Sequence, residues 1–368
     1  MIAYLAEVLR YLRLRPLVGA SDEHHLFDAA ELPRAPEPKP LPAQPAALSA
    51  DWNGRLAETK TRAFRVLRDG VVTRSWNAPG DEASRAGRLY SVTKSVLSLA
   101  WGIADAEGRV PGLDEPVFRG LTVRNLLRMD SGLGFDEGFT RLNRQVYTYL
   151  NPDARRTVRR GRLADPVARD FHYNDFHSLL LGVLLEEGLV RSGWKPSGPV
   201  AEPVAGWVWE RLLAPLGQEN AGRFVVDSTR RRFPKTESGL CLSADDLAKV
   251  GLLVLGGGAW EGRQLVPAAW LSQSTDPAQG WSGAAAFGRY QGLAWGPWLA
   301  TGRGYYGWHW WGRHESGAPN TVFALGIHGQ MLVVSPRHRA VVVRLADRWA
   351  LKDWWPEVIL DGLDSGEL

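Results

Sequence analysis

A serine and a lysine three residues apart, Ser91 and Lys94, are the pair in this sequence best suited to covalent chemistry. Residues 91–107 are rich in Val, Leu, Ala and Ile and end at Gly108, which predicts a buried helix. On a helix, residues three apart share a face, so the hydroxyl and the amine can meet. A lysine accepts a serine proton when its surroundings favour the neutral amine, and the apolar flanks supply such a setting. The helix N-terminus adds backbone N–H groups that favour an oxyanion.

The Ser-x-x-Lys spacing is weak when it stands alone. A second copy, Ser192 and Lys195, contains a glycine and runs into Pro196, which indicates a loop where the two side chains need not meet. We interpret that copy as a decoy. For Ser91 and Lys94 the alternative interpretation is a helix N-cap serine followed by a surface lysine.

The surroundings of Ser91 are similar to a known family. Residues 89–99 (LYSVTKSVLSL) resemble the first motif of the class C β-lactamase and esterase superfamily, and residues 121–133 (LTVRNLLRMDSGL) resemble its T-x-R-x-L-L-x-M-x-S-G segment. The resemblance covers roughly residues 61–349. It implies an α+β, β-lactamase/transpeptidase-like fold: an α/β lobe with a central antiparallel sheet, an all-helical lobe, and a cleft between them.

Residues 171–182 (FHYNDFHSLLLG) resemble the family's Tyr-x-Asn element. By that match Tyr173 is the catalytic tyrosine, and Asp175 stands where asparagine is usual. Asn174 is adjacent and could serve if the register slips by one. A phenol near an ammonium can exist partly as phenolate, share the work of the base with Lys94, and later protonate the leaving group. The alternative is a helix N-cap at Asp175 preceded by a packed aromatic residue.

Residues 323–330 (FALGIHGQ) resemble the Gly-x-x-Gly-Gln strand of the esterase and 6-aminohexanoate-dimer-hydrolase-type members. By this resemblance Ile327 takes the place of a Lys or His, His328 the middle position, and Gly329 the glycine. The backbone N–H of Gln330 would form the oxyanion hole together with that of Ser91. β-Lactamases use a cation at the Ile327 position to hold a substrate carboxylate, so an isoleucine favours a neutral substrate.

The resemblance thus implies a serine hydrolase that forms an acyl-enzyme on Ser91. We expect a small neutral ester or amide as substrate, as for a carboxylesterase or a 6-aminohexanoate-dimer-hydrolase-like amidase, with no metal or organic cofactor. Two alternatives stay open: a β-lactamase or D-Ala-D-Ala peptidase, and a catalytically silent relative that binds a ligand or partner, which Asp175 favours. A zinc site at His309, His314 and His328 has no supporting ligand spacing.

Composition narrows the class of protein. The chain has 368 residues, 23% of them charged, a net charge of +4 and one cysteine, Cys241, so no internal disulfide can form. We expect a cytoplasmic globular protein of undetermined oligomeric state. The arginine clusters at residues 155–162 and 230–232 carry no nucleic-acid motif and are expected to be solvated faces. Residues 1–16 predict a short amphipathic helix, and no apolar run is long enough for stable membrane insertion.

The remaining patterns predict the elements that position these residues. An Asp-Gly pair within residues 61–76 indicates a hairpin. The proline-dense residues 35–45 indicate an extended strap on the surface. We expect residues 1–60 as an N-terminal helix and strap, residues 61–107 and 288–368 as the α/β lobe, and residues 108–287 as a mostly helical lobe. Further helices are predicted at residues 121–129, 175–187, 205–213, 244–255 and 347–363, and strands at residues 305–311, 321–325, 330–334 and 340–345. Trp308 and Trp310 are expected on one face of their strand, in the core or along an acyl pocket.

Overall fold

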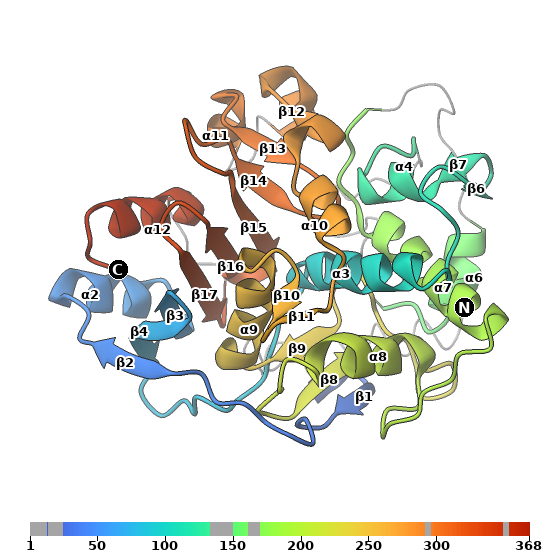
Figure 1. Cartoon of the computed structure of the whole chain (residues 1–368), viewed down its shortest axis with the longest axis horizontal. Coiled ribbons are helices and arrows are strands. Elements are labelled where there is room, and N and C mark those ends of the chain that lie inside the picture. The colour runs from blue at the N-terminus through green and yellow to red at the C-terminus, as the bar shows by residue number, and fades with distance from the viewer. Residues whose placement is uncertain (1–12, 14–24, 133–149, 161–169, 291–295, 349–352) are drawn as a thin grey trace.

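The computed structural model describes residues 25–132, 150–160, 170–290, 296–348 and 353–368, together with Arg13 (Figure 1). In these ranges the chain is a mixed α+β structure in which one large sheet has helices against both faces. The helix predicted over residues 1–16 lies outside the described residues apart from Arg13. None of the described helices is both long and apolar enough to cross a bilayer.

The large sheet joins strands from both ends of the chain. β17 pairs antiparallel with β3, placing Val342 opposite Val66, which confirms the predicted antiparallel sheet built from early and late segments. In the described residues its order is β12 (Trp281–Ser282), β13 (Gly304–Tyr306), β14 (Trp311–Arg313), β15 (Thr321–Gly326), β16 (Gln330–Ser335), β17 (Ala340–Ala346), β3 (Thr61–Arg68), β4 (Val71–Asn77) and β2 (Ala43–Ala46).

The first predicted hairpin is present. Asp69 and Gly70, at φ 52° and 81°, both have the left-handed conformation that a two-residue hairpin turn of type I′ requires between β3 and β4. The proline-dense strap ends in β2, which pairs parallel with β4. Earlier in the strap, the N–H groups of Ala35 and Lys39 donate to backbone carbonyls at residues 218 and 217, at 2.8 and 3.0 Å.

One predicted strand is wrong. Residues 305–311 form the ends of two strands, β13 and β14, because the chain leaves the sheet between them. Gly307 packs so closely on Ser274 that a Cβ atom would lie 2.2 Å from its carbonyl oxygen, and the N–H of His309 donates to the carbonyl of Leu127 at 3.2 Å. Trp308 and Trp310, placed in this excursion, are fully buried, which confirms their assignment to the core.

A smaller sheet brings distant segments beside Ser91. Its order is β1 (Ala29–Leu32), β8 (Gly222–Val225), β9 (Leu240–Leu242) and β5 (Gly87–Arg88). β5 pairs antiparallel with β9, and the N–H of Leu89 extends this contact by donating to the carbonyl of Leu240 at 2.9 Å. The segment before β9 therefore runs next to the start of the helix that follows β5. Two further strand pairs, β6 (Pro116–Phe118) with β7 (Leu121–Thr122) and β10 (Ala259–Trp260) with β11 (Arg263–Gln264), are short hairpins.

The described α-helices are α2 (Ala50–Glu58), α3 (Val92–Ala106), α4 (Val123–Leu127), α6 (Ala154–Arg159), α7 (Asp175–Arg191), α8 (Pro203–Val208), α9 (Ala244–Leu255), α10 (Ala268–Ser274), α11 (Gly296–Ala300) and α12 (Trp355–Asp364). A π-helical turn, η3 (Trp209–Leu213), continues α8, and the 3₁₀ turns are η4 (Pro277–Gln279), η5 (Ala284–Tyr290) and η6 (Ile327–Gly329). The predicted helices at 91–107, 175–187, 205–213 and 244–255 are confirmed within a few residues.

Two predicted helices are shorter than expected. The helix predicted over residues 121–129 is only α4. Thr122 caps its start by accepting a hydrogen bond from the N–H of Asn125. Met129, at φ 59°, ends the turn that follows the helix. The closing helix begins at Trp355 rather than at residue 347, with Pro356 in its first turn. Residues 349–352 lie outside the described part of the chain.

The core occupies both faces of the large sheet. Along β17, Val341, Val343 and Leu345 pack with α3 and α9, whereas Ala340 and Val342 pack with α2 and α12. This alternation follows the two-residue period of a strand buried on both sides. In Figure 1, α3 crosses the centre of the molecule, between the large sheet and the helices α4 and α7. Its N-terminus, at Ser91, is therefore reached from several elements.

Candidate active site

Ser91 precedes the first residue of α3 and is half-buried. Its side chain makes no N-cap hydrogen bond, so the hydroxyl is not used to start the helix. Instead it accepts a hydrogen bond from Lys94 Nζ at 2.9 Å. Tyr90, immediately before it, has φ 49°, a conformation that non-glycine residues adopt rarely and mostly where the structure imposes it. Ser91 occupies the N-cap position, but the alternative in which its side chain caps the helix is excluded.

Lys94 is 1% exposed, which excludes the other half of that alternative, a surface lysine. Its ammonium has three protons and donates to three acceptors: Ser91 Oγ, Asp175 Oδ1 at 2.6 Å and the backbone carbonyl of Glu237 at 2.9 Å. The adjacent carboxylate favours the charged form of the lysine. The group that would accept the serine proton is thus held in place by three hydrogen bonds, one of them to a carboxylate.

Tyr173 reaches this cluster from the loop before α7. Its ring centroid is 5.1 Å from Lys94 Nζ, and its ring stacks on Trp311 at 5.7 Å. The backbone N–H of Tyr173 is fixed by the hydroxyl of Tyr290 at 2.7 Å. Since Lys94 Nζ is itself 2.9 Å from Ser91 Oγ, the hydroxyl, the amine and the phenol ring form one group, as the motifs predicted.

The two candidates for the family's asparagine position take different directions. Asp175, the first residue of α7, points at Lys94, whereas Asn174 turns its amide to the carbonyl of His172 at 3.0 Å. The register predicted for the Tyr-x-Asn element therefore places Asp175 at the lysine without a slip. A carboxylate rather than an amide faces the ammonium.

The hairpin turn between β15 and β16 lies beside the start of α3. Gly326 approaches Leu89 so closely that a Cβ atom would lie 2.3 Å from its carbonyl oxygen. After it, Ile327 is 44% exposed, and the ring of His328 meets the ring of Tyr90 edge-on at 5.3 Å. Gly329 completes the turn and is buried. The three predicted residues thus flank the nucleophile.

Gln330, the fourth residue of that motif, is placed differently. It begins β16, an interior strand between β15 and β17, and it is 1% exposed. Its side-chain amide donates to the carbonyl of Ala346 at 2.7 Å and accepts from the N–H of Ala346 at 3.0 Å. Gln330 is therefore bound into the sheet through its side-chain hydrogen bonds to β17.

The contact through Glu237 was not predicted. The segment that contains Lys235, Thr236 and Glu237 packs tightly, since Thr236 Oγ1 donates to the carbonyl of Ser178 at 2.8 Å. Yet the Glu237 carbonyl accepts from a lysine 143 residues away, a contact that no local spacing could signal. The Glu237 side chain is fully buried, and burial raises the pKa of its carboxyl group.

Two buried histidines, His309 and His177, lie near Lys94. His309 Nδ1 lies 3.2 Å from the backbone carbonyl of Lys94, and burial with the nearby lysine charge lowers the pKa of His309 to about 3. Burial also lowers the pKa of His177 well below its usual range, and its Nε2 contacts Ser131 Oγ at 2.5 Å. Both rings are uncharged at neutral pH. Among the described residues no three His, Cys, Asp or Glu side chains come together as a metal site would require.

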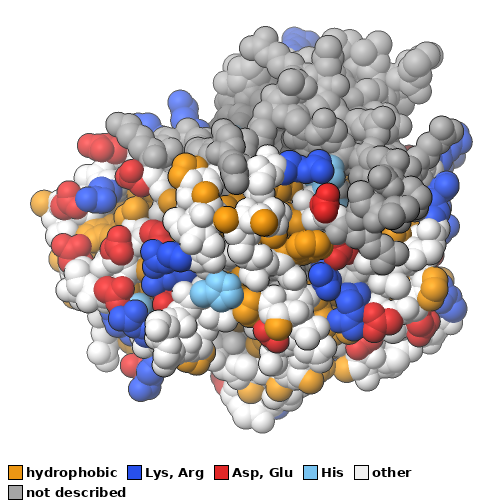
Figure 2. All heavy atoms as spheres, turned by 90° about the horizontal axis from the view of Figure 1, so that it is seen from above, with side chains coloured by type: hydrophobic (Ala, Val, Ile, Leu, Met, Phe, Trp, Pro, Cys, Tyr) orange, Lys and Arg blue, Asp and Glu red, His pale blue; other side chains and the backbone are white. Residues whose placement is uncertain are grey.

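The second Ser-x-x-Lys copy has none of these features. Ser192 and Lys195 are both exposed, and the Ser192 hydroxyl donates to the carbonyl of Leu189 at 3.0 Å, closing the end of α7. In the arginine clusters, which were expected to be solvated faces, four described members pair with acids while three of the four remain well exposed: Arg155 with Glu186, Arg159 with Glu187, Arg231 with Asp153 and Arg232 with Glu202. On the described part of the face in Figure 2, basic and acidic side chains are interspersed.

Comparison with known proteins agrees with this geometry. The model of the β-lactamase family matches residues 63–354. The 6-aminohexanoate-dimer hydrolase of Paenarthrobacter ureafaciens is 28% identical over 349 residues, 86% of this chain and 79% of that protein. A Bacillus anthracis structure provisionally assigned as a 6-aminohexanoate-dimer hydrolase has a TM-score of 0.74 at 19% identity, covering 96% of this chain and 93% of its own. A penicillin-binding protein from Bacillus halodurans has a TM-score of 0.60 at 15% identity, covering 84% and 99%. The predicted β-lactamase/transpeptidase-like fold is confirmed.

Proposed function

Because the chain belongs to the β-lactamase family, whose members include serine hydrolases, we propose that it hydrolyses a small neutral ester or amide through an acyl-enzyme on Ser91. The main support is the set of three hydrogen bonds that Lys94 makes. One of its three hydrogen bonds goes to a serine hydroxyl that the helix does not use. A half-exposed hydroxyl bonded to a buried amine is the arrangement that nucleophilic catalysis needs.

The proton path involves the phenol as well as the amine. Asp175 favours the ammonium form of Lys94, and an ammonium beside Tyr173 in turn favours the phenolate. As the Ser91 oxygen attacks the substrate carbonyl, its proton passes to this Lys94–Tyr173 pair. The same proton then goes to the departing alcohol or amine as the acyl–O or acyl–N bond breaks. A water molecule repeats the sequence on the acyl-enzyme, releasing the acid and restoring Ser91.

For the oxyanion we propose the backbone N–H groups of Ser91 and Ile327, in place of the predicted Gln330. The β14–β15 ladder ends at Phe323, so the following part of β15 presents an edge not covered by β14, and this edge runs past Leu89. Gln330, in contrast, lies between two paired strands. A donor on the edge can turn toward the reacting carbonyl, whereas one inside the sheet is committed to a neighbour.

The substrate class follows from charge. Ile327 is exposed where β-lactamases carry a cation, and the buried acid beside the nucleophile, Asp175, repels a substrate carboxylate. An uncharged acyl group meets neither obstacle. These features support an ester or amide without an acidic group near the scissile bond over a β-lactam.

The test is active-site labelling. Incubation with a fluorophosphonate should add mass to Ser91 and block hydrolysis of p-nitrophenyl acetate, and both should disappear in Ser91→Ala. Ser192→Ala is the matched control, because it removes the serine of the decoy pair and should leave labelling intact. Nitrocefin turnover at rates comparable to the ester would contradict the neutral-substrate assignment.

The Lys94–Asp175 ion pair also favours a second candidate, a silent relative that binds a ligand without turnover. A lysine locked as an ammonium cannot accept a proton, and if Tyr173 does not share that task the hydroxyl stays inert. Absence of both labelling and ester hydrolysis in folded wild-type protein would decide for this candidate.

A further inference from the structure

Arg344 is a buried cation in the middle of an otherwise apolar strand, β17. Its side chain is 0% exposed, and no carboxylate in the described residues forms an ion pair with it. Burial lowers the pKa of Arg344 to about 9, so the group still carries its charge at pH 7. A charge without a counter-ion in a core is expensive, and cores usually avoid it.

The guanidinium is satisfied by oxygens instead. It donates to the carbonyl of Gly329 at 2.6 Å, to Thr61 Oγ1 at 2.9 Å and to the carbonyl of Thr59 at 2.8 Å. It also lies over the ring of Trp355, 4.7 Å from the centroid. Thr59 follows α2, Thr61 begins β3 and Trp355 begins α12, whereas Gly329 belongs to the turn beside Ser91. Arg344 therefore ties that turn to these elements.

The turn needs such support. His328 and Gly329 have φ of 69° and 85°, so two consecutive residues are left-handed, and for a histidine this conformation is unfavourable. On the opposite side, the His328 ring contacts the ring of Tyr90, which is itself left-handed and precedes Ser91. The turn is thus held between Arg344 behind it and Tyr90 in front.

We infer that Arg344 is a positioning residue: by fixing Gly329 it keeps the N–H of Ile327 aimed, together with that of Ser91, at the reacting oxygen. The inference rests on the function proposed above. A charge-assisted hydrogen bond is shorter and stronger than a neutral one, as the 2.6 Å distance to Gly329 illustrates. An oxyanion hole works only if its donors are already in place when charge develops, so a loosened turn should lower the rate of acylation more than substrate binding.

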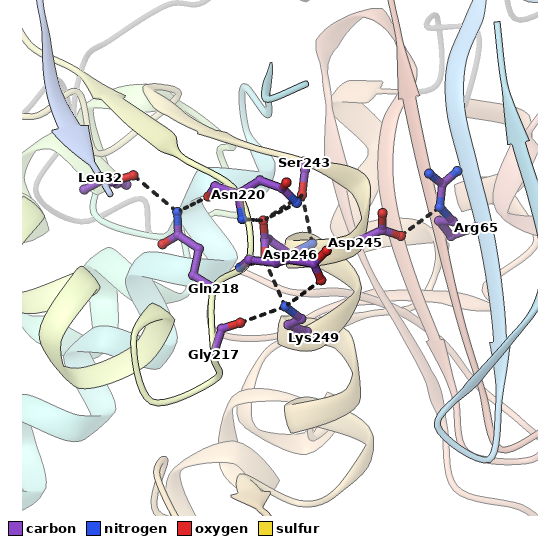
Figure 3. Close-up of polar contacts among 10 residues, drawn as sticks. Leu32, Arg65, Gly217, Gln218, Asn220, Ser243, Asp245, Asp246 and Lys249 are labelled. Carbon is purple, nitrogen blue, oxygen red and sulfur yellow. Dashed lines mark hydrogen bonds and ion pairs between the residues drawn. The ribbon is translucent and has the colours of Figure 1, made fainter. Parts of the chain in front are cut away.

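The experiment compares two buried arginines of the same sheet. Arg344→Met removes the bond to Gly329, and Arg65→Met removes another buried arginine, which bonds Asp245 (Figure 3). Both variants should lose stability. For Arg344→Met, kcat and the rate of fluorophosphonate labelling should fall by about 10- to 100-fold with KM little changed. Arg65→Met should keep both rates at a temperature where it is folded.

A chemical rescue separates positioning from general damage. In Arg344→Ala, added guanidinium at concentrations too low to unfold the protein should restore part of kcat by occupying the vacated site, and it should not stimulate Arg65→Ala. Equal losses of kcat in the two methionine variants, or full activity in Arg344→Met, would overturn the inference about Arg344. The proposed function would still stand if the wild type were labelled on Ser91. Wild-type protein that is never labelled on Ser91 would overturn both.

Discussion

Two buried lysines occupy similar surroundings in this molecule and do different things. Lys94 and Lys249 are each at most 1% exposed, and each donates to one carboxylate and to one backbone carbonyl. The carboxylate is Asp175 at 2.6 Å for Lys94 and Asp246 at 3.1 Å for Lys249. Lys249 also lies 3.8 Å from Glu219 Oε2, so burial and a nearby acid are common to both lysines and do not by themselves mark a reactive site.

The two clusters differ in the other hydrogen bonds made by the acid that pairs with the lysine and by the nearby serine. Asp246 accepts from the N–H groups of Glu219 at 2.6 Å and Asn220 at 3.0 Å. It also accepts from Ser243 Oγ at 2.7 Å and from Lys249 (Figure 3). Ser243 is in turn the N-cap of α9 and accepts from the N–H of Asp246. The side-chain oxygens of Ser243 and Asp246 are therefore all hydrogen-bonded, and these bonds hold the loop at Glu219 and Asn220 against α9.

In the Lys94 cluster, the Ser91 hydroxyl makes no helix-capping hydrogen bond. Ser91 also stands at the start of a helix, yet its hydroxyl makes no cap bond and takes its hydrogen bond from Lys94. A buried Lys–Asp pair therefore indicates a reactive site only when a hydroxyl beside it makes no structural hydrogen bond. The geometry of the serine, more than the burial of the lysine, carries the functional assignment.

The largest expected effect comes from breaking the Lys94 cluster. Lys94→Met removes the amine that shares the serine proton, and general base catalysis of this kind contributes about 10²- to 10⁴-fold. We expect a fall of that size in kcat/KM for p-nitrophenyl acetate, measured at a temperature where the variant is folded by circular dichroism. Activity within threefold of the wild type would leave Lys94 without a catalytic role.

Lys249→Met is its matched control. Each substitution leaves a buried carboxylate without its counter-charge, so both variants should lose about 3–5 kcal/mol in the free energy of unfolding. Only Lys94→Met should lose activity per folded molecule. If Lys249→Met lost activity to the same degree, the difference between the two clusters would not be functional.

Much of this contrast is local in the sequence and could be predicted. The three-residue spacing of Ser91 and Lys94 places them on one helix face, and α9 was predicted with its observed bounds because Asp245 and Asp246 mark its first turn. The strands of β17 and β3 likewise follow from short β-branched runs beside turn residues.

What the sequence could not supply depends on tertiary contacts. Asp175 and Asn174 are adjacent, and only the folded loop decides which one faces Lys94. Gln330 was expected at the oxyanion hole because its motif was read without knowing that β16 is paired on both sides. The Glu237 carbonyl reaches Lys94 through the pairing of β5 with β9, a long-range contact without a local pattern.

A smaller effect should come from changing the charge beside Lys94 while keeping the shape. Asp175→Asn removes the carboxylate that favours the ammonium, so the proton on the Lys94–Tyr173 pair is released more easily. The acid limb of the kcat/KM profile should therefore move to lower pH. Asn174→Ala, whose side chain turns to His172, should leave the limb in place. The reverse pattern would mean that Asn174 faces the lysine in solution.

The smallest expected effect concerns the Glu237 side chain, a second acid in the Lys94 cluster. Burial raises the pKa of the Glu237 carboxyl above its ordinary 4.5, opposed by Lys235 and Lys94 and reinforced by Asp175. Ser238 Oγ bonds one of its oxygens at 3.1 Å, and the other oxygen is buried without a hydrogen-bond partner. A neutral amide of the same shape should therefore fit: Glu237→Gln should cost no more than about 1 kcal/mol at pH 4, where both states of the wild type are largely protonated.

The sign of the pH dependence distinguishes this acid from a structural ion pair. A group whose pKa is raised on folding binds its proton more tightly in the native state, so it contributes stability below pH 4.5 that is lost as pH rises through the higher folded value. Urea midpoints at pH 4, 6 and 8 should therefore fall more steeply with pH for the wild type than for Glu237→Gln, and the variant should gain on the wild type as pH rises. Parallel curves would mean that Glu237 is ionised in the native protein and that the Lys94 cluster, like the Lys249 cluster, is held by charge pairing throughout.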